Sequence, residues 1–143
     1  MKNKQISVFI ENKEGRLKKA MDVLAKENIN IRALSIADTT KFGILRLIVS
    51  ETEKAKEILE NNNFVVKEND VIIVEVPDKP NGLNTILGYL DDKNVNVEYI
   101  YAFVSKKSEE AIVVVRLENI DEGIKILKEN DAYILTSEDI KSI

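Results

Sequence analysis

The feature that most constrains the fold of this chain is an internal repeat. A short apolar run, a polar turn containing glycine and a helical apolar stripe occur in that order at residues 6–26 and again at 71–92. The segment after each stripe is also repeated, as ENINIR at 27–32 and KNVNVE at 93–98. A repeat of this size indicates two copies of one supersecondary unit, so each half is expected to fold in the same way.

The first half shows the periodicities of strands and helices in a regular order. Residues 6–11 alternate with a period of two, which is typical of a strand. The next apolar residues recur at the spacing of one helical face: Leu17, Ala20, Met21 and Leu24. Further strands are expected at 29–36, 43–49 and 64–66, with a short helix at 53–60. The order β-α-β-β-α-β is that of the ferredoxin-like, or split βαβ, arrangement.

The second half repeats this order. Strands are expected at 71–76, 97–104, 111–117 and 133–135, and helices at 83–90 and 121–128. We therefore predict an α+β chain of two tandem βαββαβ units, with antiparallel sheets and helices on one face. The first unit is expected at residues 1–70 and the second at 71–143.

The composition narrows the chemistry that is available. The 143 residues include no Cys and no His, so thiolate nucleophiles, disulfides and the usual general base near neutral pH are excluded. The net charge is −4 with both signs interspersed, which argues against a nucleic-acid partner. No apolar run approaches the roughly 20 residues that span a bilayer, so we expect no membrane partner and a cytoplasmic protein. Neither a metal ion nor a cofactor is expected, because no metal-ligand spacing or phosphate loop occurs.

The two turns are the first candidates for a functional site. Gly15 and Gly82 each stand where a strand passes into a helix. One interpretation is that glycine permits a tight turn, and the other is that it keeps the turn open for a ligand. Backbone N–H groups at a helix start have no intrahelical partner and can bind a small anion such as a carboxylate.

Asparagines flank the same elements. Asn12 begins the first turn and Asn30 begins the second strand, while Asp78 and Asn96 take these places in the second half. A side-chain amide has two donors and an acceptor, which suits the carboxylate and ammonium of an amino acid. A role in closing turns explains the asparagines equally well. Asp78 could hold an ammonium group but would repel a carboxylate.

Several strands are apolar on both sides. The run 43–49 has apolar residues on both of its faces, and 112–115 is apolar throughout. Strands that are buried on both faces have this composition. The face without helices, or a sheet edge, is therefore expected to be covered by the other half or by another chain, and a homodimer is the simplest assembly.

These motifs together resemble a known family. Residues 10–17 (IENKEGRL) and 28–31 (NINI) resemble the opening of an ACT domain, and 76–83 (VPDKPNGL) with 94–97 (NVNV) resembles it again. The whole chain is thus similar to the small stand-alone proteins with two tandem ACT domains. The resemblance implies an allosteric regulatory module that binds an amino acid at a domain or subunit interface and has no catalytic activity of its own.

The resemblance also implies which residues bind the ligand. In the first half these are Asn12, Lys13, Gly15, Arg16, Leu17, Ile29, Asn30 and Ile31. In the second half they are Asp78, Gly82 and Asn96, with Asn81 in the place of the usual glycine. The first half is favoured because its Asn12, Gly15 and Asn30 are all present.

Three functions remain to be compared. The favoured one is a regulatory module that senses a small amino acid and controls amino-acid metabolism. The alternative is a regulatory subunit that acts by protein contact on a biosynthetic enzyme such as a branched-chain acetohydroxyacid synthase. An enzyme that uses carboxylates with Lys13 or Lys79 is the third, and it requires a deep pocket with a strongly shifted pKa.

Overall fold

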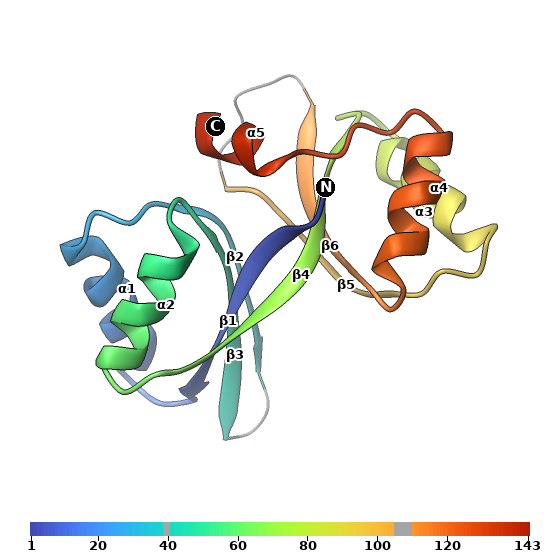
Figure 1. The fold of residues 1–143 in the computed structure, drawn as a ribbon. Helices are drawn as coiled ribbons and strands as arrows, with labels where there is room; N and C mark the ends of the chain where they lie inside the picture. Colours follow the sequence, from blue (N-terminus) through green and yellow to red (C-terminus); the bar gives the residue numbers. More distant parts are fainter. Residues whose placement is uncertain (39–40, 105–109) are drawn as a thin grey trace. The chain divides into compact units, whose positions relative to one another are not determined.

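The computed structural model describes residues 1–38, 41–104 and 110–143 (Figure 1). The chain forms two compact units, one of Lys4–Asn69 and one that combines Met1–Asn3 with Asp70–Ile143. The first three residues therefore associate with the second half, where the Asn3 side chain donates a hydrogen bond of 3.0 Å to the carbonyl of Leu135.

The first unit has the expected ferredoxin-like order. Its elements are β1 (Asn3–Glu11), α1 (Arg16–Lys26), β2 (Ile31–Asp38), β3 (Phe42–Val49), α2 (Thr52–Asn61) and the first part of β4 (Val65–Val76). Its strands follow the order β2-β3-β1-β4, and β3 pairs antiparallel with both β1 and β2. Both helices lie on one face of this sheet (Figure 1). The fold predicted for this half is confirmed.

The stripe on α1 supplies part of the first core, with one correction. Ala20, Val23 and Leu24 are buried against β1, β3 and α2. Leu17 was expected in this stripe, but 38% of its surface is exposed. It lies in the first turn of the helix, which begins beyond the end of β1, so the sheet offers it little to pack against.

The second unit repeats the arrangement. Its elements are the rest of β4, α3 (Gly82–Asp91), β5 (Val97–Ala102), β6 (Ala111–Leu117), α4 (Ile120–Glu129) and α5 (Ser137–Ser142). The strands follow the order β4-β6-β5. The strand expected at 133–135 is reduced to a single antiparallel bridge between Ile134 and Val74. Its backbone still bonds to β4, through Leu135 to Ile73 and through Glu75 to Tyr133.

Two local predictions were wrong. The strands expected at 64–66 and 71–76 are one continuous strand, β4, because the polar residues between them keep an extended backbone. The Ser7 hydroxyl donates to the Asn69 side chain at 2.6 Å, and Arg116 donates to the carbonyl of Asp70. The second error is α5, which was not expected, because six residues are too few to show a helical period.

Backbone conformations confirm the repeat at a spacing of 66 residues. Asn28 and Asn94 have φ of 57° and 56°, so both close their helices in the left-handed conformation, as expected. Gly15 and Asn81 have φ of 81° and 72° at the starts of α1 and α3. Asn81, rather than Gly82, is therefore the structural counterpart of Gly15.

Candidate functional site

The turn between β1 and α1 is open. Gly15 has a φ of 81°, which favours glycine, and a Cβ placed on it would meet no atom within 4 Å. No side chain caps the start of α1. The Arg16 N–H donates to the carbonyl of Lys13 at 3.4 Å and the Lys19 N–H to that of Gly15 at 3.0 Å. The N–H groups of Leu17 and Lys18 have no backbone acceptor within the described ranges, so they could bind a small carboxylate. The positive φ satisfies the tight-turn interpretation of Gly15, and the open space permits the ligand interpretation as well.

The charged residues of this turn are engaged with neighbours. The Lys13 ammonium lies 3.1 Å from the Glu11 carboxylate, at an exposed position. This contact, with a smaller contribution from Arg16, lowers the pKa of Glu11 below its usual value. The Arg16 guanidinium lies over the Phe64 ring at 4.9 Å, and its buried Nε has no hydrogen-bond partner in the described part of the chain. Arg16 thus packs on the rim of the first core.

The second turn is filled by its own side chains. The Asn81 amide oxygen accepts a hydrogen bond from the Asn84 side chain at 2.9 Å, and its nitrogen donates to the Thr85 hydroxyl at 3.3 Å. A Cβ on Gly82 would lie 1.9 Å from the carbonyl oxygen of Pro77. Backbone packing therefore explains the glycine at position 82 without a ligand. Asp78 is exposed at the start of this turn.

Asn30 and Asn96 occupy equivalent positions just before β2 and β5. Their carbonyls accept hydrogen bonds from the backbone of Ser50 at 2.9 Å and of Glu118 at 3.1 Å. Both residues are exposed, so their amides are accessible to solvent or a ligand. The neighbours Ile29 and Ile31 pack in or against the first core. They fix the backbone around Asn30.

The sheet register separates the two parts of the predicted site. Glu11 is opposite Phe42 at one end of β3, and Ile31 is opposite Val49 at the other end. Seven residues at about 3.3 Å each place the two ends roughly 23 Å apart. The structure therefore brings Asn12, Lys13, Gly15, Arg16 and Leu17 together, and it groups Ile29, Asn30 and Ile31 elsewhere. One unit cannot place both groups around one small amino acid.

The second unit has the same geometry. Val76 is opposite Ala111, while Val97 is opposite Leu117 at the other end of β6. Six residues at about 3.3 Å each separate Asp78 and Gly82 from Asn96 by roughly 20 Å. In each unit the two groups of predicted site residues thus lie at opposite ends of the sheet.

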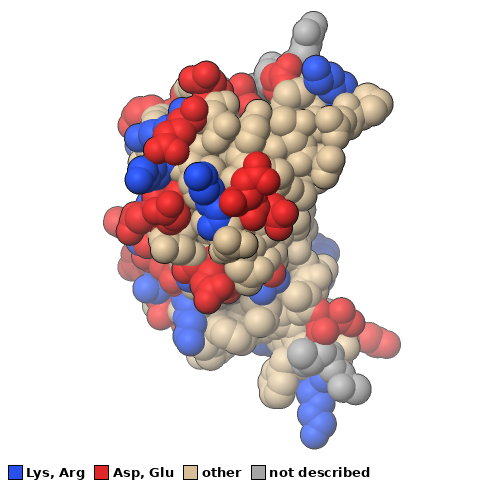
Figure 2. Space-filling view, turned by 90° about the vertical axis from the view of Figure 1, so that its right-hand side faces the viewer, with Lys and Arg blue, Asp and Glu red and all other residues tan. Residues whose placement is uncertain are grey.

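The described residues can be compared with the partners considered from the sequence, which were nucleic acid, a metal ion and a membrane. On the face shown in Figure 2, acidic and basic side chains are interspersed without a broad basic patch among the described residues. Within residues 1–38, 41–104 and 110–143, no group of three His, Cys, Asp or Glu side chains is placed to hold a metal ion. The helices of the described chain include none long and apolar enough to cross a membrane.

The start of α5 carries a capping box formed by Thr136 and Asp139, which was not predicted from the sequence. The Thr136 hydroxyl accepts from the Asp139 backbone N–H at 3.2 Å, and the Asp139 carboxylate accepts from the Thr136 N–H at 2.8 Å. The same carboxylate accepts a hydrogen bond of 3.0 Å from the Tyr133 hydroxyl. The available signal was the spacing of Thr136 and Asp139, which is that of a capping box.

Replacing Asp139 with asparagine should destabilise the protein in a pH-dependent way. The hydrogen bonds from Thr136 and Tyr133 lower the pKa of Asp139 below its usual value. A lowered folded-state pKa means that the stabilisation is fully present above the unfolded value and is lost as the pH falls through the folded one. Urea unfolding at pH 7, 5 and 3 should therefore show a difference between wild type and Asp139→Asn that shrinks below about pH 4.

Glu138→Gln is the matched control, because the neighbouring Glu138 is exposed and forms only a 3.7 Å ion pair with Lys141. Such a surface pair contributes little. A difference between Asp139→Asn and wild type that stays constant from pH 7 to 3 would contradict the role of the ionised carboxylate.

The chain consists of two tandem ferredoxin-like units. In each unit the turn before the first helix and the start of the second strand lie at opposite ends of the sheet. This arrangement defines a class of small double-domain proteins. Comparison with known families identifies the class further. The model of the ACT domain pair matches residues 1–143, so the chain belongs to the ACT domain pair family. The resemblance to ACT domains noted from the sequence is confirmed. None of the curated proteins compared with this chain matches it.

Solved structures agree with this assignment. A protein from Bacteroides thetaiotaomicron is 43% identical, with a TM-score of 0.93 over 100% of this chain and 98% of its own. The regulatory subunit of aspartate kinase from Thermus thermophilus is 16% identical, with a TM-score of 0.62 over 88% and 91% of the two chains. The corresponding subunit from Thermus flavus is 17% identical, with a TM-score of 0.60 over 88% and 90%. The two Thermus subunits share the fold of this chain.

Proposed function

We propose that this protein is a non-catalytic regulatory module that binds a small amino acid and regulates amino-acid metabolism. The observation that carries the proposal is the open turn at Gly15, where the uncapped start of α1 offers backbone N–H groups to a carboxylate. Membership of the ACT domain pair family supports a regulatory role. Two proteins of the same fold are regulatory subunits of aspartate kinase, which is a role of this kind.

In the proposed complex the ligand carboxylate accepts hydrogen bonds from the N–H groups of Leu17 and Lys18 in the first turn of α1. The exposed Asn12 amide is close in sequence to these N–H groups and available to the same carboxylate. The Lys13 ammonium would contact it by leaving its exposed ion pair with Glu11, which costs little at the surface. Leu17 is 38% exposed beside the turn and offers an apolar surface to the ligand side chain. A small, partly apolar amino acid fits these three contacts.

A second copy of the chain completes the site in this proposal. Asn30 lies roughly 23 Å from the turn within its own unit, so its amide can reach the ligand only from another molecule. A twofold axis would place the turn of one copy against Asn30 of its partner, and would do so twice. We therefore propose a homodimer whose assembly depends on the ligand.

The first half is the proposed binding half. In the second half the Asn81 side chain occupies the turn and is held there by Asn84 and Thr85. The exposed Asp78 adds a negative charge that opposes a carboxylate. In this proposal the second unit binds no ligand, and the roles of Asp78, Gly82 and Asn96 are structural.

A thermal-shift panel with the twenty amino acids tests the proposal. A ligand at a hundredfold excess over its Kd should stabilise the protein by about 2.7 kcal/mol and raise Tm by about 5–10 °C. Asn30→Ala should abolish the shift while leaving the Tm of the free protein unchanged, because Asn30 is exposed. The matched control is Asn96→Ala at the equivalent position, which should keep the shift.

The absence of a shift with every amino acid would exclude this function. The alternative, a subunit that acts on a biosynthetic enzyme by contact alone, would then be tested by co-purification of the enzyme with the tagged protein.

A further inference from the structure

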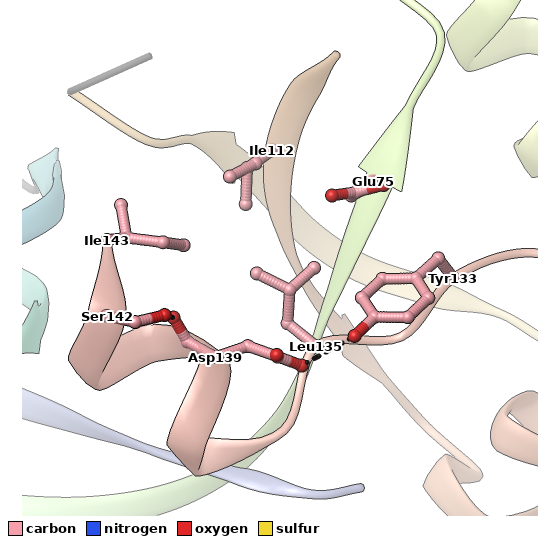
Figure 3. A pocket seen from close by; sticks show the side chains of 7 residues that line it. All are labelled: Glu75, Ile112, Tyr133, Leu135, Asp139, Ser142 and Ile143. Carbon is pink, nitrogen blue, oxygen red and sulfur yellow. Dashed lines mark hydrogen bonds between the residues drawn. The ribbon is translucent and has the colours of Figure 1, made fainter. Parts of the chain in front are cut away.

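A pocket of about 440 Å³ lies in the second unit between the sheet and α5 (Figure 3). Its floor is the face of β4 and β6 that carries Glu75 and Ile112, which pair across these strands. The opposite face of the same strands packs on α3 and α4. This volume is within the range of small-molecule sites. The pocket is therefore separate from the turn at Gly15, which lies in the first unit.

The pocket combines an apolar lining with negative charge. Ile112 and Leu135 are only 6% and 2% exposed, and Ile143 of the C-terminal segment adds a further apolar wall. Glu75 and Asp139 contribute two carboxylates from opposite sides (Figure 3). Among the described residues, no Lys or Arg lines this pocket.

The polar groups of the lining are arranged to accept hydrogen bonds. The Tyr133 hydroxyl donates a hydrogen bond to the Asp139 carboxylate, so it is not available as a donor to a ligand. Asp139 is held in place by Thr136, whereas Glu75 is half-buried and makes no ion pair within the described ranges. A half-buried carboxylate that lacks a partner is stabilised by an ion pair with a cation. An anionic ligand would meet two like charges.

We propose that this pocket binds a small organic cation, a primary amine or diamine with a short aliphatic body. Glu75 forms the ion pair with the ammonium group, and Ile112, Leu135 and Ile143 pack against the aliphatic part. Charge-assisted hydrogen bonds to a carboxylate are among the stronger polar contacts in proteins, so Glu75 determines the affinity. The apolar walls distinguish this site from one for a hydrated metal ion, which requires more oxygen ligands.

The test is calorimetric titration of the full chain with 1,5-diaminopentane at low ionic strength, with pentanoate as the matched anion. We expect saturable 1:1 binding of the diamine and none of pentanoate. Glu75→Gln should weaken binding at least tenfold, while Glu57→Gln, at an exposed carboxylate on α2, should leave it unchanged. Asn30→Ala should also bind the diamine normally, because this site does not depend on the proposed amino-acid site.

Methyl NMR of the wild-type protein provides a measurement that needs no variant. The diamine should shift the methyl resonances of Ile112, Leu135 and Ile143. The proposal is overturned if these resonances do not respond, if pentanoate binds as well, or if folded Glu75→Gln retains wild-type affinity. It is equally overturned if magnesium displaces the diamine at equimolar concentration, because the site would then be one for a metal ion.

Discussion

Replacing Gly82 with alanine is expected to destabilise the protein by about 3 kcal/mol. The added Cβ would lie 1.9 Å from the carbonyl oxygen of Pro77 and 3.0 Å from its carbonyl carbon. These are backbone atoms, and the Lys79 N–H holds that oxygen in a hydrogen bond of 2.9 Å. The clash therefore cannot be relieved by rotating a side chain, and the turn itself has to open.

Gly88→Ala is the matched control in the same helix. A Cβ at Gly88 would meet no atom within 4 Å, and the position lies inside α3. Alanine is favoured over glycine in a helix interior by about 1 kcal/mol, so this variant should be more stable than the wild type. Urea unfolding monitored by circular dichroism measures both changes. Equal stabilities for the two variants would show that the backbone of Pro77 does not pack closely against Gly82.

Much of the fold could be predicted from the sequence because the signals were local and occurred twice. The spacing of Ala20 and Leu24 predicted the helix, and Asn28 and Asn94 marked the ends of α1 and α3. The continuity of β4 could not be predicted, because partners distant in sequence, such as Arg116, hold its polar segment extended. Leu17 shares the helical stripe of Ala20 and Leu24 and is nevertheless exposed, because periodicity does not show where a sheet ends.

The candidate site was predictable only in part. The open turn follows from the glycine at position 15, whose positive φ is a local property. The separation of Asn30 from this turn depends on the register of β2 and β1 against β3, which the sequence pattern does not contain. The pocket beneath α5 depends on how a six-residue helix folds back onto β4 and β6. Neither the distance between Asn30 and the turn nor the pocket produces a periodic pattern in the sequence, so neither could be predicted from it.

The truncation of equivalent core leucines should have a large effect in both units. Leu24 on α1 and Leu90 on α3 are each 1% exposed and belong to separate hydrophobic clusters. Leu24→Ala and Leu90→Ala should each lower the free energy of unfolding by about 2–5 kcal/mol, through lost burial and the cavity left behind. Urea unfolding of each purified variant gives these values directly.

The controls are the leucines seven residues earlier on the same helices. Leu17 and Leu83 are 38% and 39% exposed, so Leu17→Ala and Leu83→Ala should each cost less than about 1 kcal/mol. Leu17→Ala should nevertheless weaken amino-acid binding, because Leu17 borders the open turn in the proposed complex, whereas Leu83→Ala should not. A large loss of stability in Leu17→Ala would place this leucine in the core and remove it from the proposed site. Unchanged stability combined with reduced binding would separate the role of Leu17 from that of Leu24, although both residues belong to one apolar stripe in the sequence.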